Sequence, residues 1–109
     1  VVVESQWGEL VGFENHSGLT TLGPGATPMG RVRIGRGNNG RDGTEGAIYR
    51  NAVGCYLHGS LLPKNPALAD WLIERALRRK HGSVDLPPLS DTLEDAARRV
   101  AVSRAETTR

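Results

Sequence analysis

The chain has 109 residues, enough for one domain with one modest core, and its net charge is only +2, from 14 basic and 12 acidic residues. The basic residues never form a run of five or more, so solvated charged faces are favoured over nucleic-acid binding. No apolar run approaches the roughly 18 residues of a membrane helix, and the single cysteine excludes an internal disulfide. We therefore expect a cytoplasmic protein without a membrane span, stabilised by packing.

Short β-strands are predicted throughout the first 60 residues. Residues 1–4 (VVVE) and 8–14 (GELVGFE) are rich in branched and aromatic side chains and are bounded by Gly, Ser and Asn. Residues 31–34 (RVRI) alternate as a half-buried strand does, after a long loop rich in Gly and Pro. Residues 46–51 (GAIYRN) and 52–59 (AVGCYLHG) continue the pattern, and the second is apolar enough for an interior strand.

The first predicted helix covers residues 66–81. Asn65 is placed as its N-cap, Pro66 occupies the first helical position, and Gly82 follows its end. The expected apolar face consists of Leu68, Trp71, Leu72, Ile73, Ala76 and Leu77.

A second helix is predicted for residues 90–106. Residues 85–89 (DLPPL) separate it from the first, because proline does not continue a helix. Asp91 and Glu94 have the spacing of a capping box at its start. The whole pattern predicts a β-rich first half followed by two helices.

Cys55 precedes His58 by three residues, which raises the question of a cysteine–histidine catalytic pair. In an extended strand, residues three apart point to opposite faces, with Cα atoms about 10 Å apart. A nucleophile and its base need contact at about 3 Å, so we interpret Cys55 as a small buried side chain. His58 ends an apolar segment, a position where catalytic groups gather in open α/β sheets. The residues alone leave two readings of His58, a general base or a structural histidine.

Two further motifs are explained without a bound ligand. Residues 35–40 (GRGNNG) match G-x-G-x-x-G, but RDGTEG follows instead of an apolar helix. A β-turn or hairpin loop is therefore favoured over nucleotide binding. The three histidines and the cysteine lack the spacing of zinc ligands, so neither a metal nor a cofactor is expected. These residues are His16, Cys55, His58 and His81.

The segment GFENHSG concentrates polar side chains between a strand and a glycine turn. Its members Glu14, Asn15 and His16 have two interpretations of equal weight. They line a functional site, or they satisfy the backbone of the turn.

Three segments, in this order, resemble one family: residues 8–18 (GELVGFENHSG), 35–51 (GRGNNGRDGTEGAIYRN) and 53–73 (VGCYLHGSLLPKNPALADWLI). They look like the C-terminal half of glutamine amidotransferase domains of the cobyric acid synthase type, a group that includes the amidotransferase subunits of lipid II isoglutaminyl synthases. The resemblance covers nearly the whole chain and is weakest after Gly82. It implies a flavodoxin-like α/β fold, of which residues 1–109 are a partial domain.

The resemblance also implies a glutaminase site built from a cysteine and a histidine. The histidine of the YLHG segment corresponds to His58, and the family typically has Thr where this chain has Cys55. The nucleophilic cysteine lies at a strand-to-helix turn of the N-terminal half, which is absent here, so the chain alone is expected not to hydrolyse glutamine. Ser60 stands where many other amidotransferases place a carboxylate, which leaves Glu14 as the candidate for an acid that orients His58.

The partners implied by the resemblance are glutamine and an ATP-dependent subunit resembling a Mur ligase. Ammonia would pass to that subunit for amidation of the D-glutamate of lipid II. Two alternatives are the amidotransferase part of a cobyric acid synthase and a non-catalytic remnant that docks a partner. A partial domain would also expose a sheet edge and apolar surface, which favours self-association.

Overall fold

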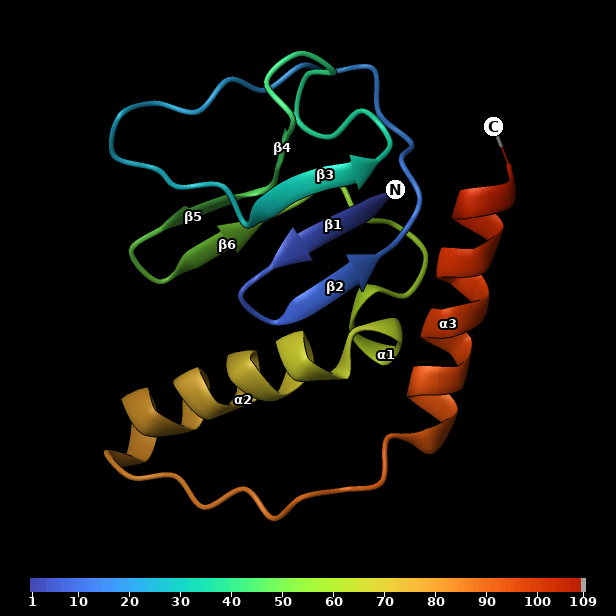
Figure 1. The fold of residues 1–109 in the computed structure, drawn as a ribbon. Helices are drawn as coiled ribbons and strands as arrows, with labels where there is room; N and C mark the ends of the chain where they lie inside the picture. The colour runs from blue at the N-terminus through green and yellow to red at the C-terminus, as the bar shows by residue number, and fades with distance from the viewer. Residues whose placement is uncertain (109) are drawn as a thin grey trace.

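The structure, a computed structural model, describes residues 1–108 as a mixed α/β arrangement with helices outside the sheet (Figure 1). The strands are β1 (Val2–Ser5), β2 (Gly8–Val11), β3 (Gly30–Ile34), β4 (Thr44–Glu45), β5 (Ala47–Tyr49) and β6 (Ala52–Gly54). The helices are α1 (Leu61–Lys64), α2 (Pro66–His81) and α3 (Thr92–Thr107). Within residues 1–108, every helix is too short or too polar to cross a membrane. The predicted α/β class is confirmed.

Four strands form one antiparallel sheet in the order β2-β1-β3-β4. In its register, Val3 on β1 lies opposite Leu10 on β2 and Val32 on β3, so one face of these strands is apolar. β5 and β6 form a separate hairpin, and a bridge between Thr27 and Ile48 joins it to the long loop before β3. The β-rich first half is therefore confirmed.

Residues 52–59 do not form the predicted interior strand. β6 ends at Gly54, pairs with β5 alone, and is exposed at both of its end residues. Beyond it, the backbone N–H of Tyr56 donates to the side chain of Glu45 at 2.6 Å, where a neighbouring strand would otherwise supply the acceptor. Backbone pairing resumes only at His58. The apolar composition of this segment reflects core packing and not an interior place in a sheet.

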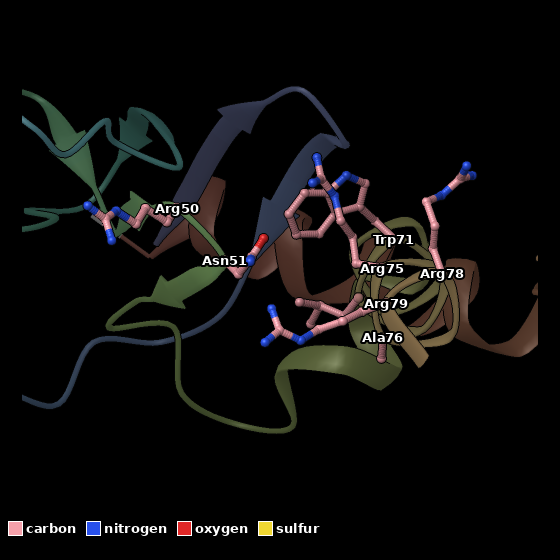
Figure 2. Close-up of a pocket in the computed structure, with 8 residues that line it drawn as sticks. Arg50, Asn51, Trp71, Arg75, Ala76, Arg78 and Arg79 are labelled. Atoms are coloured by element: carbon pink, nitrogen blue, oxygen red, sulfur yellow. The ribbon is translucent and has the colours of Figure 1, made fainter. Parts of the chain in front are cut away.

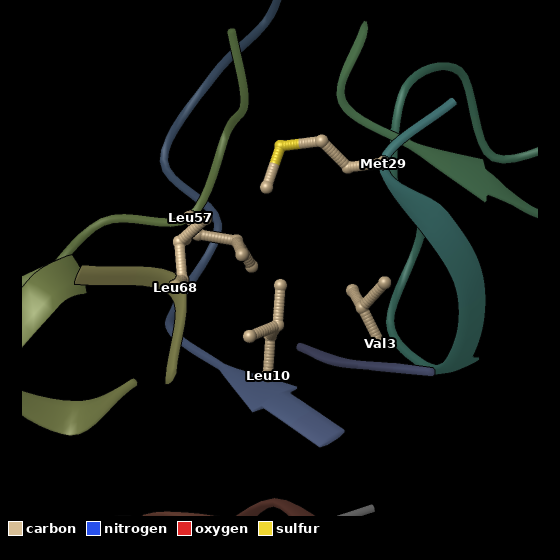
Figure 3. Close-up of a cluster of buried hydrophobic side chains, with 5 residues drawn as sticks. All are labelled: Val3, Leu10, Met29, Leu57 and Leu68. Carbon is tan, nitrogen blue, oxygen red and sulfur yellow. The ribbon is translucent and has the colours of Figure 1, made fainter. Parts of the chain in front are cut away.

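The core lies between the main sheet and α2 (Figures 1 and 3). Its members, Val3, Leu10, Met29, Leu57 and Leu68, are each at most 5% exposed. Figure 3 shows that they come from strands, a helix and the connecting segments and converge on one interior space. Leu57 directly precedes His58, so the core anchors the segment that carries the candidate catalytic histidine.

α2 begins at Pro66 and ends before Gly82, as predicted. Its apolar face is narrower than predicted, because only the first two turns reach the core: Leu68 is buried, whereas Ile73 is 49% exposed. Trp71 packs edge-on against Trp7 of the β1–β2 turn, with ring centroids 5.0 Å apart. The later turns of α2 present mostly charged side chains to solvent.

Asn65 precedes α2, but its side chain does not cap the helix. Its Oδ1 accepts the N–H of Val11 at 2.9 Å, and its Nδ2 donates to the carbonyls of Val11 at 3.0 Å and Leu61 at 2.7 Å. An amide carries both a donor and an acceptor, so it satisfies the end of β2 as a neighbouring strand would. Asn65 occupies the predicted N-cap position, but its side chain makes no capping bond, because this buried pairing uses the same amide.

Replacement of Asn65 with alanine is expected to lower the free energy of unfolding by about 2 kcal/mol, because it leaves the buried N–H and C=O of Val11 without partners. Denaturant titration would measure the loss. Asn51→Ala, at an exposed turn residue, is the matched control and should change stability by less than about 0.5 kcal/mol. Equal losses in the two variants would contradict the role assigned to Asn65.

α3 lies beside β2 at one end of the sheet (Figure 1). Arg33 on β3 connects them, donating to Glu9 at 2.6 Å and to Glu106 of α3 at 2.9 Å. The predicted capping box of Asp91 and Glu94 was wrong, since Asp91 precedes the helix without a side-chain capping bond. Its backbone angles, φ −98° and ψ 23°, lie outside the extended region in which an N-cap side chain turns back to the helix.

Candidate functional site

His58 is paired with the residue that continues β2. Its N–H donates to the carbonyl of Phe13 at 2.9 Å, and the N–H of Phe13 donates to the His58 carbonyl at 3.1 Å. Directly opposed residues of an antiparallel bridge point to the same face, and the two rings lie side by side with centroids 6.1 Å apart. The backbone of His58 is thus fixed, while its side chain is exposed.

The chain reverses direction immediately after His58. Gly59 and Ser60 both have left-handed backbones, with φ of +83° and +60°, and the Lys64 ammonium donates to the Gly59 carbonyl. A Cβ at position 59 would lie 2.2 Å from Cε1 of Phe13, so glycine allows the Phe13 ring to cover the turn. His58 therefore occupies a tight corner between the bridge and α1.

Glu14, the predicted orienting acid, is bound to the loop between β3 and β4. Its Oε1 accepts the backbone N–H of Arg36 at 2.9 Å, and it also accepts the N–H of Gly37. Adjacent residues of an extended segment point to opposite faces, so Glu14 is directed away from the face that Phe13 and His58 share. Among the described residues no hydrogen bond joins Glu14 to His58, and the orienting role stays a prediction.

His16 and Glu14 line one cavity of about 500 Å³. Its lining residues are Glu14, His16, Ser17, Leu19, Arg36, Gly37, Asn39 and Gly40. The imidazole of His16 stacks on Tyr56, with centroids 3.7 Å apart and planes 7° from parallel. Asn15 is exposed, and neither it nor His58 lines this cavity. The structure thus brings two of the predicted site residues, Glu14 and His16, to one cavity that His58 does not line.

The loop of residues 35–43 is a turn, as predicted. The Oδ1 of Asn39 accepts the N–H groups of Arg41 at 2.9 Å and Asp42 at 3.0 Å. Asp42 in turn accepts from the N–H and the hydroxyl of Thr44. The Thr44 hydroxyl, followed by the Asn39 amide, lowers the pKa of Asp42 below its ordinary value. These polar side chains are therefore used to hold the loop together.

Cys55 is half-buried beside the core. Burial raises the pKa of its thiol above the ordinary value, so little thiolate forms at neutral pH. This environment agrees with its interpretation as a structural side chain. Within residues 1–108, no group of three or more His, Cys, Asp and Glu side chains is placed to hold a metal ion.

Glu45 on β4 was not singled out from the sequence. It is 0% exposed, and one carboxyl oxygen accepts the N–H of Tyr56. Burial raises the pKa of this carboxyl, and the hydrogen bond from Tyr56 opposes that shift to a smaller extent. Glutamate is ordinarily exposed, and the turn dipeptide and glycine around it give no signal of burial.

A second cavity, of about 380 Å³, lies between α2 and the β5–β6 turn (Figure 2). Its lining residues are Arg50, Asn51, Trp71, Leu72, Arg75, Ala76, Arg78 and Arg79. The guanidinium of Arg75 lies 4.6 Å from the centroid of the Trp71 ring, and Figure 2 shows Arg78 pointing away from the hollow. None of the predicted site residues lines this basic surface.

The chain resembles proteins of known family. Residues 2–66 match the CobB/CobQ-like glutamine amidotransferase domain. The chain is 42% identical over 106 residues to the GatD subunit of the glutamine-hydrolysing lipid II isoglutaminyl synthase of Staphylococcus aureus (strain N315), covering 96% of this chain and 43% of that protein. Identity is 43% over 83 residues to the Streptococcus pneumoniae (strain ATCC BAA-255 / R6) subunit of the same name, covering 75% of this chain and 32% of that protein.

A more distant relative is the probable cobyric acid synthase of Methanothermobacter thermautotrophicus, 36% identical over 98 residues. That alignment covers 89% of this chain and 18% of the relative. The chain therefore spans less than half the length of the curated relatives it matches.

Proposed function

We propose, because this chain belongs to the family of CobB/CobQ-like glutamine amidotransferase domains, that it is the C-terminal part of a glutaminase that supplies ammonia for amidation of lipid II. The observation that carries the proposal is the placement of His58: an exposed imidazole on a backbone held by the Phe13 bridge and the Gly59 turn. A general base needs this combination of access and fixed position. The similarity to two lipid II isoglutaminyl synthase subunits supports lipid II as the acceptor of the ammonia.

In the complete protein, a cysteine outside these 109 residues is the nucleophile. His58 takes the thiol proton, and the thiolate attacks the side-chain amide carbon of glutamine. Backbone N–H groups near that cysteine stabilise the tetrahedral oxyanion, and protonated His58 passes its proton to the departing ammonia. Water then hydrolyses the thioester to glutamate. Cys55 takes no part, because its thiol is half-buried with a raised pKa.

The complete domain is proposed to be flavodoxin-like and cytoplasmic, with this chain supplying the segment that carries the histidine. Its partner is an ATP-dependent subunit resembling a Mur ligase, which activates the D-glutamate carboxyl of lipid II for attack by ammonia. No cofactor is assigned to the glutaminase part itself.

The test is a coupled assay of the complete protein with its candidate ligase. Glutamine hydrolysis is followed as glutamate release, and lipid II amidation by mass spectrometry of the stem peptide. Amidated lipid II is the expected result. Glutamine hydrolysis with amidation of a corrinoid instead would favour the cobyric acid synthase alternative. Ligase binding without any glutamine hydrolysis would favour a non-catalytic docking module.

The isolated chain of residues 1–109 is expected to release no ammonia from glutamine. Its single cysteine is half-buried, and nothing else among the described residues offers a thiolate to His58. Incubation of the purified chain with glutamine, compared with the complete protein at equal concentration, measures this. Hydrolysis that disappears in Cys55→Ser would instead make Cys55 a nucleophile and overturn the assignment.

A further inference from the structure

Glu45 is an acidic side chain that is removed from solvent. It is fully buried on β4, its Oε1 accepts the N–H of Tyr56 at 2.6 Å, and its Oε2 has no hydrogen-bond partner within residues 1–108. A buried carboxylate with an unpartnered oxygen is costly, so a residue of this kind calls for a specific role. Its one bond is directed at the segment that leads to His58.

The three residues from Tyr56 to His58 are held at successive points. The N–H of Tyr56 is bound by Glu45, Leu57 is packed in the core, and the backbone of His58 forms both bridge bonds with Phe13. β6 has already ended at Gly54, so no neighbouring strand holds the start of this segment. The side chain of Tyr56 is also held, by stacking on His16 and by a hydrogen bond to Thr20, so the Glu45 bond is the one that fixes its backbone N–H.

We propose that Glu45 is a positioning residue for His58: its carboxyl accepts the N–H of Tyr56, fixes the backbone there and so sets where the imidazole lies. This inference rests on the proposed role of His58 as the base of a glutaminase. Glu45 makes no contact with the imidazole among the described bonds, so it acts through the backbone and not as an acid that orients the ring.

The surroundings of the Glu45 carboxyl disfavour its charged form, because burial raises its pKa. Burial is the largest influence on the Glu45 pKa and raises it, and the charge of Glu14 raises it further. The N–H of Tyr56 and the nearby His16 act in the opposite direction, and Cys55 is the other titratable group that senses Glu45. A neutral carboxyl keeps a carbonyl oxygen as acceptor for Tyr56 without burying a charge.

The test compares Glu45→Gln with Glu45→Ala in the complete protein. Glutamine keeps the acceptor and the volume, so kcat for glutamine hydrolysis should stay within about threefold of the parent. Alanine removes the acceptor, and kcat should fall about 10- to 100-fold through displacement of His58, while KM for glutamine changes by less than about threefold. An unchanged kcat in Glu45→Ala would overturn the positioning role.

Two further variants keep the result interpretable. Val2→Ala truncates a buried side chain on the opposite face of the same sheet, so it should lower the melting temperature and leave kcat unchanged. A similar loss of kcat in Val2→Ala would mean that general destabilisation explains the effect. If Glu45→Ala does not fold, Glu45→Asp replaces it, because the shorter side chain draws the carboxyl away from Tyr56; a parental kcat there would also overturn the proposal.

The raised pKa of Glu45 is tested separately, by the pH dependence of stability. A carboxyl whose pKa is raised on folding contributes its full stabilisation below its ordinary pKa, and this contribution is lost as pH rises toward the raised value. The melting temperature of the parent, relative to Glu45→Gln, should therefore fall as pH rises through that window. A constant difference would contradict the raised pKa of Glu45, and a Glu45→Gln enzyme as slow as Glu45→Ala would overturn the positioning role. An inactive His58→Ala beside a fully active Glu45→Ala would reject the positioning role and leave the proposed function intact.

Discussion

Replacement of His58 with alanine in the complete protein should lower kcat/KM for glutamine hydrolysis by about 10²- to 10⁴-fold, the usual contribution of a general acid–base group. The imidazole is exposed, and the bonds that fix this position are made by the backbone, so alanine keeps them. The free energy of unfolding should change by less than about 0.5 kcal/mol, as for other exposed sites. Steady-state kinetics and denaturant titration of the same preparation separate the two effects.

His81→Ala is the matched control for His58→Ala. His81 is exposed at the last residue of α2, and its ring has no hydrogen-bond partner within residues 1–108. This variant should hydrolyse glutamine at the parental rate. Near-normal turnover in His58→Ala would remove His58 from the mechanism, and equal losses in the two variants would point to a general effect of losing a histidine.

Replacement of Gly37 with alanine should lower the free energy of unfolding by about 2–5 kcal/mol. Gly37 has φ of +64°, and a Cβ there would lie 2.2 Å from the carbonyl oxygen of Thr44 and 2.5 Å from Cγ2 of Val32. The backbone oxygen belongs to β4 and cannot turn away as a flexible side chain would. The change should also displace the loop that holds Glu14.

Gly43→Ala separates the cost of a left-handed backbone from the cost of the clash with Thr44 and Val32. Gly43 lies in the same loop with a similar φ of +70°, but nothing lies within 4 Å of its added Cβ. Its cost should be only about 1 kcal/mol, the penalty of a left-handed backbone for alanine. Denaturant titration of both variants gives the comparison. If Gly37→Ala cost no more than Gly43→Ala, the predicted clash with Thr44 would be wrong.

Elements with strong local signals were predictable from the sequence. Pro66 and Gly82 marked the two ends of α2 correctly. The backbone preference of each residue acts at its own position, whatever packs around it. The turn at residues 35–43 was predictable for the same reason. β4 and α1, of two and four residues, were not, since elements this short have no periodicity to read.

The use of individual polar side chains was less predictable. Asn65 is of a residue type favoured at N-caps and stands directly before α2. Its amide nevertheless binds Val11 of β2, 54 residues away in the chain. Glu14 lines a cavity and also accepts the backbone N–H groups of Arg36 and Gly37, more than 20 residues away. In both cases only folding brings the hydrogen-bond partner close. No local sequence pattern therefore shows which backbone groups these side chains bind.

By itself, the sequence determined the β-rich first half, the bounds of α2 and the loop at GRGNNG, and the resemblance of the YLHG segment made His58 the candidate base. Only the tertiary structure decided how that histidine is held. The bridge to Phe13, the turn at Gly59 and the buried Glu45 are contacts between separate segments of the chain. Local propensity acts on neighbouring residues, whereas burial and hydrogen-bond partners depend on which distant segments meet.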